Sequence, residues 1–131
     1  MTKQKEKLIE QIREFAGRFY KKHPDIIKQT NHYLDSADYD QLVLLMEKVD
    51  QDFKLSAGVL QFEVLGFAYE LQGEHYATID FHLTESSFEK AMGAYENGMH
   101  YATGSGEGWH FRKLYDTAEQ RIKRLKQKIS T

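Results

Sequence analysis

The sequence predicts an all-α fold, built as a short helical-repeat array of about seven helices. Two observations support this prediction. Apolar residues recur at three- and four-residue spacings over long stretches at both ends of the chain, which is the periodicity of helices. The segment around residue 33 is also similar to the segment around residue 69, and such self-similarity is typical of repeat proteins. At 131 residues, the chain is expected to form a single domain, 1–131.

The N-terminal part predicts three helices. The first covers residues 2–22, and its apolar stripe consists of Leu8, Ile12, Phe15, Ala16 and Phe19. Pro24 ends this helix and can start the second one, because proline disfavours helical geometry in the residue before it and suits the first helical position. A break at Ser36 separates the second helix from a third, which ends near Phe53.

Two more helices are predicted toward the C-terminus. Ser86 and Glu89 form a capping-box pattern that would start one of them. The last helix carries apolar residues at spacings of three and four from Phe111 to Ile129. Its basic residues crowd toward the C-terminal end, where the helix dipole favours them. The glycine-rich segment GSGEG, residues 104–108, is predicted to be the loop before it.

The middle of the chain, residues 57–84, supports two interpretations. As a helix, it places Leu60, Val64, Phe67 and Leu71 at spacings of four, three and four, with Gly73 as a left-handed stop. Its polar residues lie on opposite sides of the helical wheel, as in a helix packed between neighbours. As a β-hairpin at 59–84, it uses the strict alternation of apolar and polar residues from His75 to Leu83. The hairpin would make the fold α+β.

The self-similarity favours the helical interpretation. At an offset of 36 residues, Tyr33 aligns with Tyr69, and the predicted breaker Ala37 aligns with Gly73. The segment LGFAYELQGEHYATI, with Leu65, Gly66, Tyr69 and Gly73, resembles the tetratricopeptide repeat, whose first helix carries Leu-Gly-x-x-Tyr and then a glycine. The likeness covers roughly residues 24–128 in three copies of unequal quality, and it departs from the repeat at Thr78 and in lacking the inter-repeat proline.

The resemblance implies a concave face lined by the first helix of each pair. The expected partner-binding residues on this face are Ile27, Asn31, Leu34, Glu63, Phe67, Glu70, Met92, Tyr95 and Met99. They combine apolar anchors with acids, which suits a basic helix or an extended peptide. The function predicted in this way is a non-enzymatic adaptor, regulator or chaperone-like module that binds a protein or peptide.

The charge is distributed unevenly along the chain. Residues 1–22 carry seven Lys and Arg against three Glu, and residues 112–131 carry seven against two acids. The remaining residues are strongly acidic. The pattern indicates an acidic groove for a basic partner, a homodimer formed through the acidic face, or simply solvated helix faces and ends that neutralise the middle.

Few residues suggest a catalytic, cofactor-binding or metal-binding site. GSGEG lacks the Lys-Ser/Thr of a phosphate loop, and the six histidines lack the spacing of a metal site, so no cofactor and no metal are expected. Under the hairpin interpretation, Asp80 and His82 would share a face of a small α+β pocket protein that binds or transforms a small molecule. The basic C-terminal segment lacks the aromatics of a nucleic-acid site. With no Cys and no long apolar stretch, a cytoplasmic protein without a membrane partner is expected.

Overall fold

The computed structural model describes residues 3–52, 58–102 and 104–130 of the chain. These residues form six α-helices and one 3₁₀ turn, without a β-strand among them. The elements are α1 Lys3–Phe19, α2 Pro24–Asp35, α3 Tyr39–Asp52, η1 Gly58–Leu60, α4 Gln61–Tyr76, α5 Phe81–Tyr101 and α6 Ser105–Ser130. The all-α prediction is confirmed, and the β-hairpin predicted at 59–84 is wrong. The predicted end of the third helix near Phe53 lies outside the described residues.

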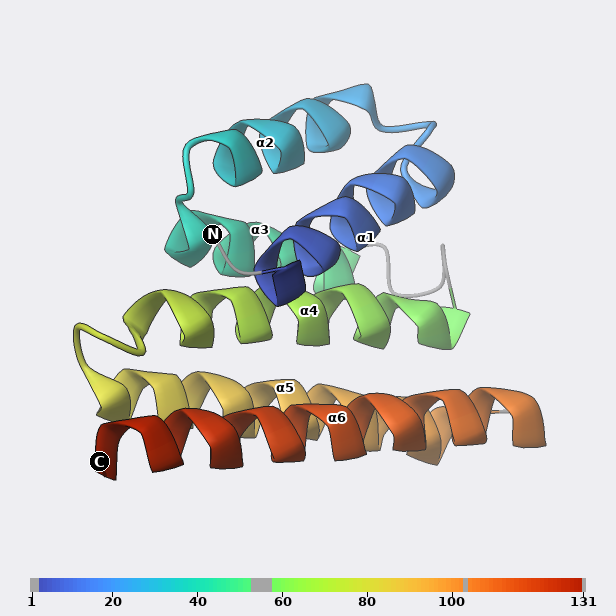
Figure 1. The fold of residues 1–131 in the computed structure, drawn as a ribbon. Coiled ribbons are helices and arrows are strands. Elements are labelled where there is room, and N and C mark those ends of the chain that lie inside the picture. The colour runs from blue at the N-terminus through green and yellow to red at the C-terminus, as the bar shows by residue number, and fades with distance from the viewer. Residues whose placement is uncertain (1–2, 53–57, 103, 131) are drawn as a thin grey trace.

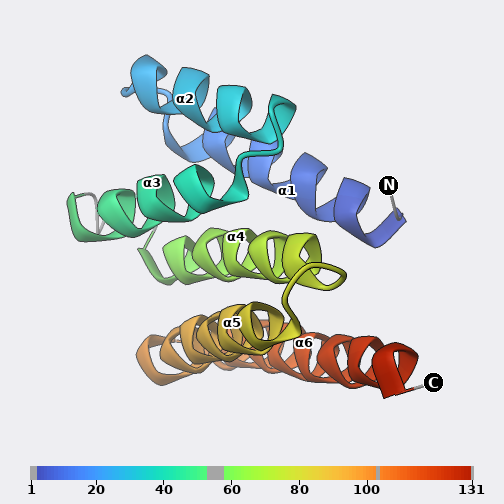
Figure 2. The ribbon, with the colours of Figure 1, turned by 90° about the vertical axis from the view of Figure 1, so that its left-hand side faces the viewer.

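α2 lies at one end of the molecule, α1 and α3 lie between α2 and α4, and α5 and α6 lie at the other end (Figures 1 and 2). α1 and α3 both contact α4, and α5 and α6 form the last layer. α1 and α6 lie on the same side of α4, whereas α3 and α5 lie on the other side. This arrangement makes α4 the centre of the stack.

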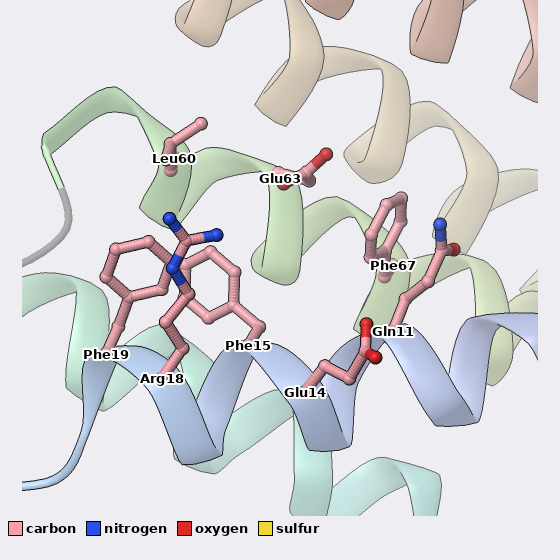
Figure 3. A pocket seen from close by; sticks show the side chains of 8 residues that line it. All are labelled: Gln11, Glu14, Phe15, Arg18, Phe19, Leu60, Glu63 and Phe67. Carbon is pink, nitrogen blue, oxygen red and sulfur yellow. The ribbon is translucent and has the colours of Figure 1, made fainter.

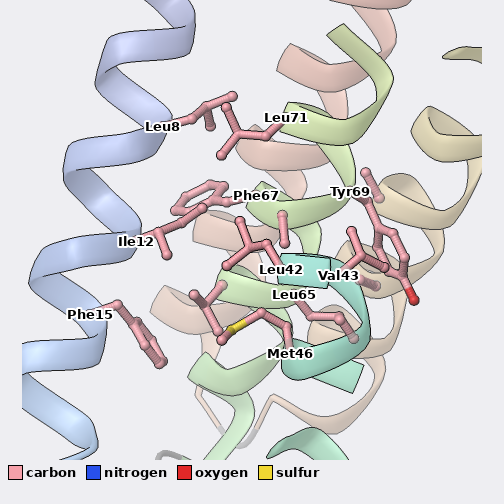
Figure 4. Close-up of a cluster of buried hydrophobic side chains, with 14 of the residues drawn as sticks. Leu8, Ile12, Phe15, Leu42, Val43, Met46, Leu65, Phe67, Tyr69 and Leu71 are labelled. Atoms are coloured by element: carbon pink, nitrogen blue, oxygen red, sulfur yellow. The ribbon is translucent and has the colours of Figure 1, made fainter. Parts of the chain in front are cut away.

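Residues on every side of α4 are buried, which confirms the expectation of a helix packed between neighbours. Phe67 and Leu71 meet Leu8 and Ile12 of α1 on one side (Figure 4). On the side of α3, Tyr69 is buried and its hydroxyl donates a hydrogen bond to Glu47 over 2.5 Å. α4 contacts α1, α3 and α5, so most of its circumference is covered by other helices. This explains why its sequence lacks the single polar face of a surface helix.

The predicted helix stop at Gly73 is wrong, because α4 continues to Tyr76. Gly73 serves close packing instead: a Cβ there would lie 2.7 Å from the Phe88 ring of α5. Thr84 of α5 donates its hydroxyl to the Gly73 carbonyl over 2.8 Å. This carbonyl is among the last four of α4, which lack partners within the helix, so the side chain of the next helix satisfies it.

The predicted start of the following helix at the Ser86 capping box is also wrong. α5 begins at Phe81, and the Asp80 carboxylate caps it by accepting a hydrogen bond from the His82 N–H over 3.1 Å. Asp80 therefore acts as a helix cap, and the acid–base pair with His82 that the hairpin interpretation suggested is not formed. The alternation that favoured a strand includes Ile79 and Leu83, which are 67% and 40% exposed.

The glycine-rich segment is mostly helical, contrary to the predicted loop at 104–108. α6 begins at Ser105, so Gly106 and Gly108 lie in its first turn. At the other end of the chain, α1 ends at Phe19, three residues before the predicted boundary. The break after α2 is confirmed: Ala37 adopts a left-handed conformation with φ 54°.

Candidate functional site

The largest part of the candidate site is a depression of about 490 Å³ between α1 and α4 (Figure 3). α1 supplies one wall and α4 supplies the floor. Its lining residues are Gln11, Glu14, Phe15, Arg18, Phe19, Leu60, Glu63 and Phe67. Aromatic rings from α1 lie beside Glu14, Glu63 and Arg18, so the surface combines apolar contact with two acidic side chains and one basic side chain.

A second, smaller depression of about 130 Å³ continues the first one along α4. Gln11 and Phe67 line both, which makes them one continuous surface. In this second part α6 forms the opposite wall with Leu114, Thr117 and Arg121. We call the whole feature the α1/α4/α6 groove: α4 is its floor, and α1 and α6 are its walls.

Helical periodicity explains how α1 serves both the core and the groove. Leu8, Ile12 and Phe15 follow each other at spacings of four and three and point into the core. Gln11, Glu14 and Arg18, at spacings of three and four, form the neighbouring row of the same helix and line the groove. One helix thus presents an apolar row to α4 and a polar row to the groove beside it.

The end of the groove near Glu63 is acidic and partly exposed. Glu14 is exposed on the α1 wall, and the Glu63 carboxylate forms a hydrogen bond with Nε2 of His110 on α6. The guanidinium of Arg18 lies 5.2 Å from the centre of the Phe19 ring, so this cation is held against an aromatic side chain. Glu14 is thus the exposed acid at this end, whereas Glu63 is already engaged by His110.

The other end of the groove contains a buried ion pair. Glu70 on α4 accepts hydrogen bonds from Arg121 on α6 and from the Tyr95 hydroxyl on α5, and all three residues are almost fully buried. Burial raises the pKa of Glu70, and the opposing effects of Arg121 and Tyr95 reduce this rise. Burial, reinforced by the charge of Glu70, raises the pKa of Tyr95. The three side chains join α4, α5 and α6 into one hydrogen-bonded unit.

The structure brings three of the predicted partner-binding residues together. Glu63, Phe67 and Glu70 follow each other along the floor of the groove. Phe67 and Glu70 are only 4% and 3% exposed, so they shape the floor and offer little surface. Tyr95 lies beneath the floor with no exposed surface.

The remaining predicted residues lie elsewhere. Met92 and Met99 belong to the surface between α5 and α6, and not to the groove. Asn31 on α2 accepts a hydrogen bond from Arg13 of α1 over 2.8 Å, next to an ion pair of Arg13 with Asp35. The predicted face is therefore divided among three surfaces.

Sequence reasoning missed the walls of the groove. The sequence did not identify Gln11, Glu14 and Arg18, because the periodicity of α1 marks only its apolar stripe. The polar row beside this stripe looks like any solvent-exposed helix face. Arg121 did carry a signal. It follows Ala118 by three residues and precedes Leu125 by four, which places a charge on the apolar stripe of α6 and indicates a buried partner.

Comparison with known protein families, with curated proteins and with solved structures gives no significant match for this chain. Among the residues that the structure describes, no three His, Asp or Glu side chains converge as the ligands of a metal ion would. None of the described helices combines the length and apolar character needed to span a membrane.

Proposed function

We propose that this chain is a non-enzymatic binding module whose α1/α4/α6 groove holds a basic, partly apolar peptide segment of another protein. The observation that carries the proposal is the groove itself, a continuous depression that runs along α4 between two flanking helices. A groove between helices is a common way for helical proteins to hold a peptide or an amphipathic helix.

The chemistry of the groove supports a peptide ligand. Phe19 and Leu60 are partly exposed at its wider end and offer apolar contacts for anchor side chains. Buried aromatic and aliphatic anchors contribute most of the affinity in such interfaces. The residues that form the groove floor are already buried in the free chain, so the surface that a ligand would contact is formed before binding.

The charge of the groove supports a basic ligand. Glu14 and Glu63 lie at the wider end, where Arg18 is already held against Phe19. Toward the other end, Arg121 neutralises Glu70 within the protein. A Lys or Arg of the ligand would therefore be attracted mainly to Glu14, which would steer its approach and set its direction in the groove.

The resemblance to tetratricopeptide repeats is carried forward as a hypothesis about how the helices pair. In that hypothesis, α2 pairs with α3 across the turn at Ala37, α4 is the first helix of the next pair, and successive pairs stack to create a binding face. The hypothesis concerns the origin of the fold, whereas the peptide proposal depends on the groove alone.

The test is a selection of peptides from a random displayed library on the wild-type chain, followed by affinity measurement with fluorescent synthetic peptides. We expect the enriched peptides to combine Lys or Arg with apolar anchors. Glu14→Lys should weaken their binding several-fold, because it reverses a charge in the groove wall. The matched control is Glu10→Lys, the same change one turn earlier on α1, at a position that lines a different depression.

A failure to enrich any peptide above an unrelated control protein would contradict the proposal. So would peptides whose affinity is equal for Glu14→Lys and the wild-type chain. Circular dichroism of both variants would establish that the fold is retained.

A further inference from the structure

A second surface, separate from the groove, runs along the outer side of the last layer. Two depressions of about 640 and 220 Å³ lie on it, and all residues that line them belong to α5 or α6. We call this surface the α5/α6 seam. It lies at the end of the helical stack (Figures 1 and 2), where α5 and α6 form the final layer.

The seam carries apolar side chains from both of its helices. On α5, Met92 and Met99 are seven residues apart, and both are partly exposed. On α6, Trp109 is 70% exposed and lines the same depression as Met99, while Ile122 lines the other depression with Met92. Such a row along two antiparallel helices is the pattern that a further pair of helices would cover.

The charges of the seam are separated between its two helices. At one end, α5 contributes Glu85 and Glu89, and α6 contributes Lys123 and Lys126. Nζ of Lys126 lies 3.7 Å from Oε2 of Glu85. The acidic row of α5 and the basic row of α6 therefore lie side by side at the same level along the helix axes. One half of the seam is thus complementary to the other half, as an interface between identical chains requires.

We propose that the α5/α6 seam is a homodimer interface, in which two copies of this chain form a four-helix bundle. A two-fold axis parallel to the helices places α5 of each copy against α6 of the other. Glu85 and Glu89 of one copy then face Lys123 and Lys126 of the other, and each Trp109 lies over Met99 of the other copy. Each α5 runs antiparallel to the α6 that it meets, which is favourable for the helix dipoles.

The basic side chains of α6 also disfavour the other two-fold arrangement. An axis perpendicular to the helices would lay α5 against α5 and α6 against α6. Lys123 of one copy would then approach Arg112 of the other. Like charges at these positions oppose association, so this contact favours the axis that runs along the helices.

The size of the seam sets the strength of the dimer. From Trp109 to Lys126 it is about 26 Å long and about 20 Å wide, which gives roughly 500 Å² per copy and about 1,000 Å² in total. This area is at the lower limit of specific interfaces. We therefore expect a reversible dimer.

The test is sedimentation of the full chain over a range of concentrations, combined with the fluorescence of Trp109, the one Trp of the sequence. The mass should rise from 15.4 kDa toward twice this value as the concentration increases. The Trp109 emission should shift to shorter wavelengths in parallel, because the indole ring becomes covered. Trp109→Ala should weaken the dimer, whereas Leu44→Ala, which removes an exposed apolar residue of α3, should leave it unchanged.

Charge reversal tests the proposed axis. Glu85→Lys/Glu89→Lys and Lys123→Glu/Lys126→Glu should each weaken self-association by about ten-fold or more, since both contacts then join like charges. An equal mixture of the two variants should dimerise again, because each acidic row then meets a basic row. A chain that stays at 15.4 kDa with unchanged emission at high micromolar concentration would overturn the proposal. Dimers that tolerate both reversals, or a mixture that does not recover, would overturn it equally.

Discussion

At the scale of single residues, the Glu70–Arg121 pair links α6 to the floor of the groove. Both side chains are almost fully buried, and Glu74 lies 4.0 Å from the same guanidinium. Burying two charges costs free energy, which their mutual attraction and the Tyr95 hydrogen bond offset. Removing either charge alone would therefore leave the other one buried without its counter-charge, and this is the main reason that the fold needs both.

We expect Arg121→Met to lower the free energy of unfolding by about 3–5 kcal/mol at neutral pH, because it leaves Glu70 buried without its counter-charge. The double variant Glu70→Gln/Arg121→Met should recover much of this loss. Urea unfolding of the two variants and of the wild-type chain measures both effects. Equal stability of the single and double variants would contradict the coupling of the two charges.

The same variant has a defined pH dependence. The pKa of Glu70 is raised in the folded state, mainly by burial, and loss of Arg121 would raise it further. A carboxyl with a raised folded pKa binds its proton more tightly when folded, so stability falls as pH increases from the unfolded value of 4.5 through the folded pKa. The cost of Arg121→Met should thus be smaller near pH 4.5 than at pH 7. An equal loss of stability at the two pH values would contradict the predicted direction of the pH dependence.

Ala37 is the other residue-scale feature with a clear consequence. It adopts φ 54°, where its side chain is strained, and it ends α2 with two backbone hydrogen bonds: Ala37 N–H to the Leu34 carbonyl and Asp38 N–H to the Tyr33 carbonyl. Ala37→Gly should raise the stability by about 0.5–1 kcal/mol, since glycine adopts this conformation without strain. Thermal melting measures the change. The control Ala77→Gly, at φ −56° after α4, should lower the stability.

At the scale of elements, glycines control how closely the helices approach. A Cβ at Gly66 would collide with the Tyr95 ring, and one at Gly98 would collide with the Phe111 ring. Gly93 on α5 has open space around it. Gly66 thus sets the distance between α4 and α5, whereas Gly98 sets the distance between α5 and α6.

A glycine that lies against an aromatic ring and a glycine with open space around it should respond oppositely to substitution by alanine. Gly66→Ala should destabilise the fold by about 1–3 kcal/mol, because the buried Tyr95 ring has to move. Gly93→Ala should stabilise it by about 1 kcal/mol, because alanine favours a helix interior. Chemical denaturation of both variants provides the comparison. A stabilising Gly66→Ala would show that α4 and α5 are not in close contact there.

The sequence allowed the existence of most helices to be predicted, but their ends were harder to predict. The stripe from Leu60 to Leu71 identified α4 correctly because its spacing is helical. Gly73 was mistaken for a stop because close packing and chain reversal both favour glycine, and only the position of Phe88 distinguishes them. Asp80 was overlooked as a cap because the alternation around it resembled a strand.

At the scale of the whole molecule, the basic ends of the chain lie beside its acidic middle. α1 and α6 lie on the same side of α4 (Figure 1). Burial raises the pKa of Glu74 on α4, and the charges of Arg121, Lys5 and Lys128 counteract this rise. Part of the predicted separation of charge is thus neutralised within the fold, and Glu14 remains as the exposed acid of the groove.

The floor of the groove could be predicted from the sequence, but its walls could not. Glu63, Phe67 and Glu70 share one row of a single helix, so helical spacing alone brings them together. The walls require knowing that α1 and α6, which are far apart in the sequence, flank the same helix. Met92 and Met99 were assigned to the wrong surface for the same reason: their row on α5 faces α6, and not the groove.

The most direct test of the proposed function is an NMR titration of the ¹⁵N-labelled chain with a basic peptide selected on it. We expect the largest amide shifts at Gln11, Glu14 and Phe19 of α1 and at Glu63 of α4, with little change at the exposed positions of α2. Shifts that concentrate on α2 and α3, or on the outer side of α5 and α6, would contradict the α1/α4/α6 groove as the binding site.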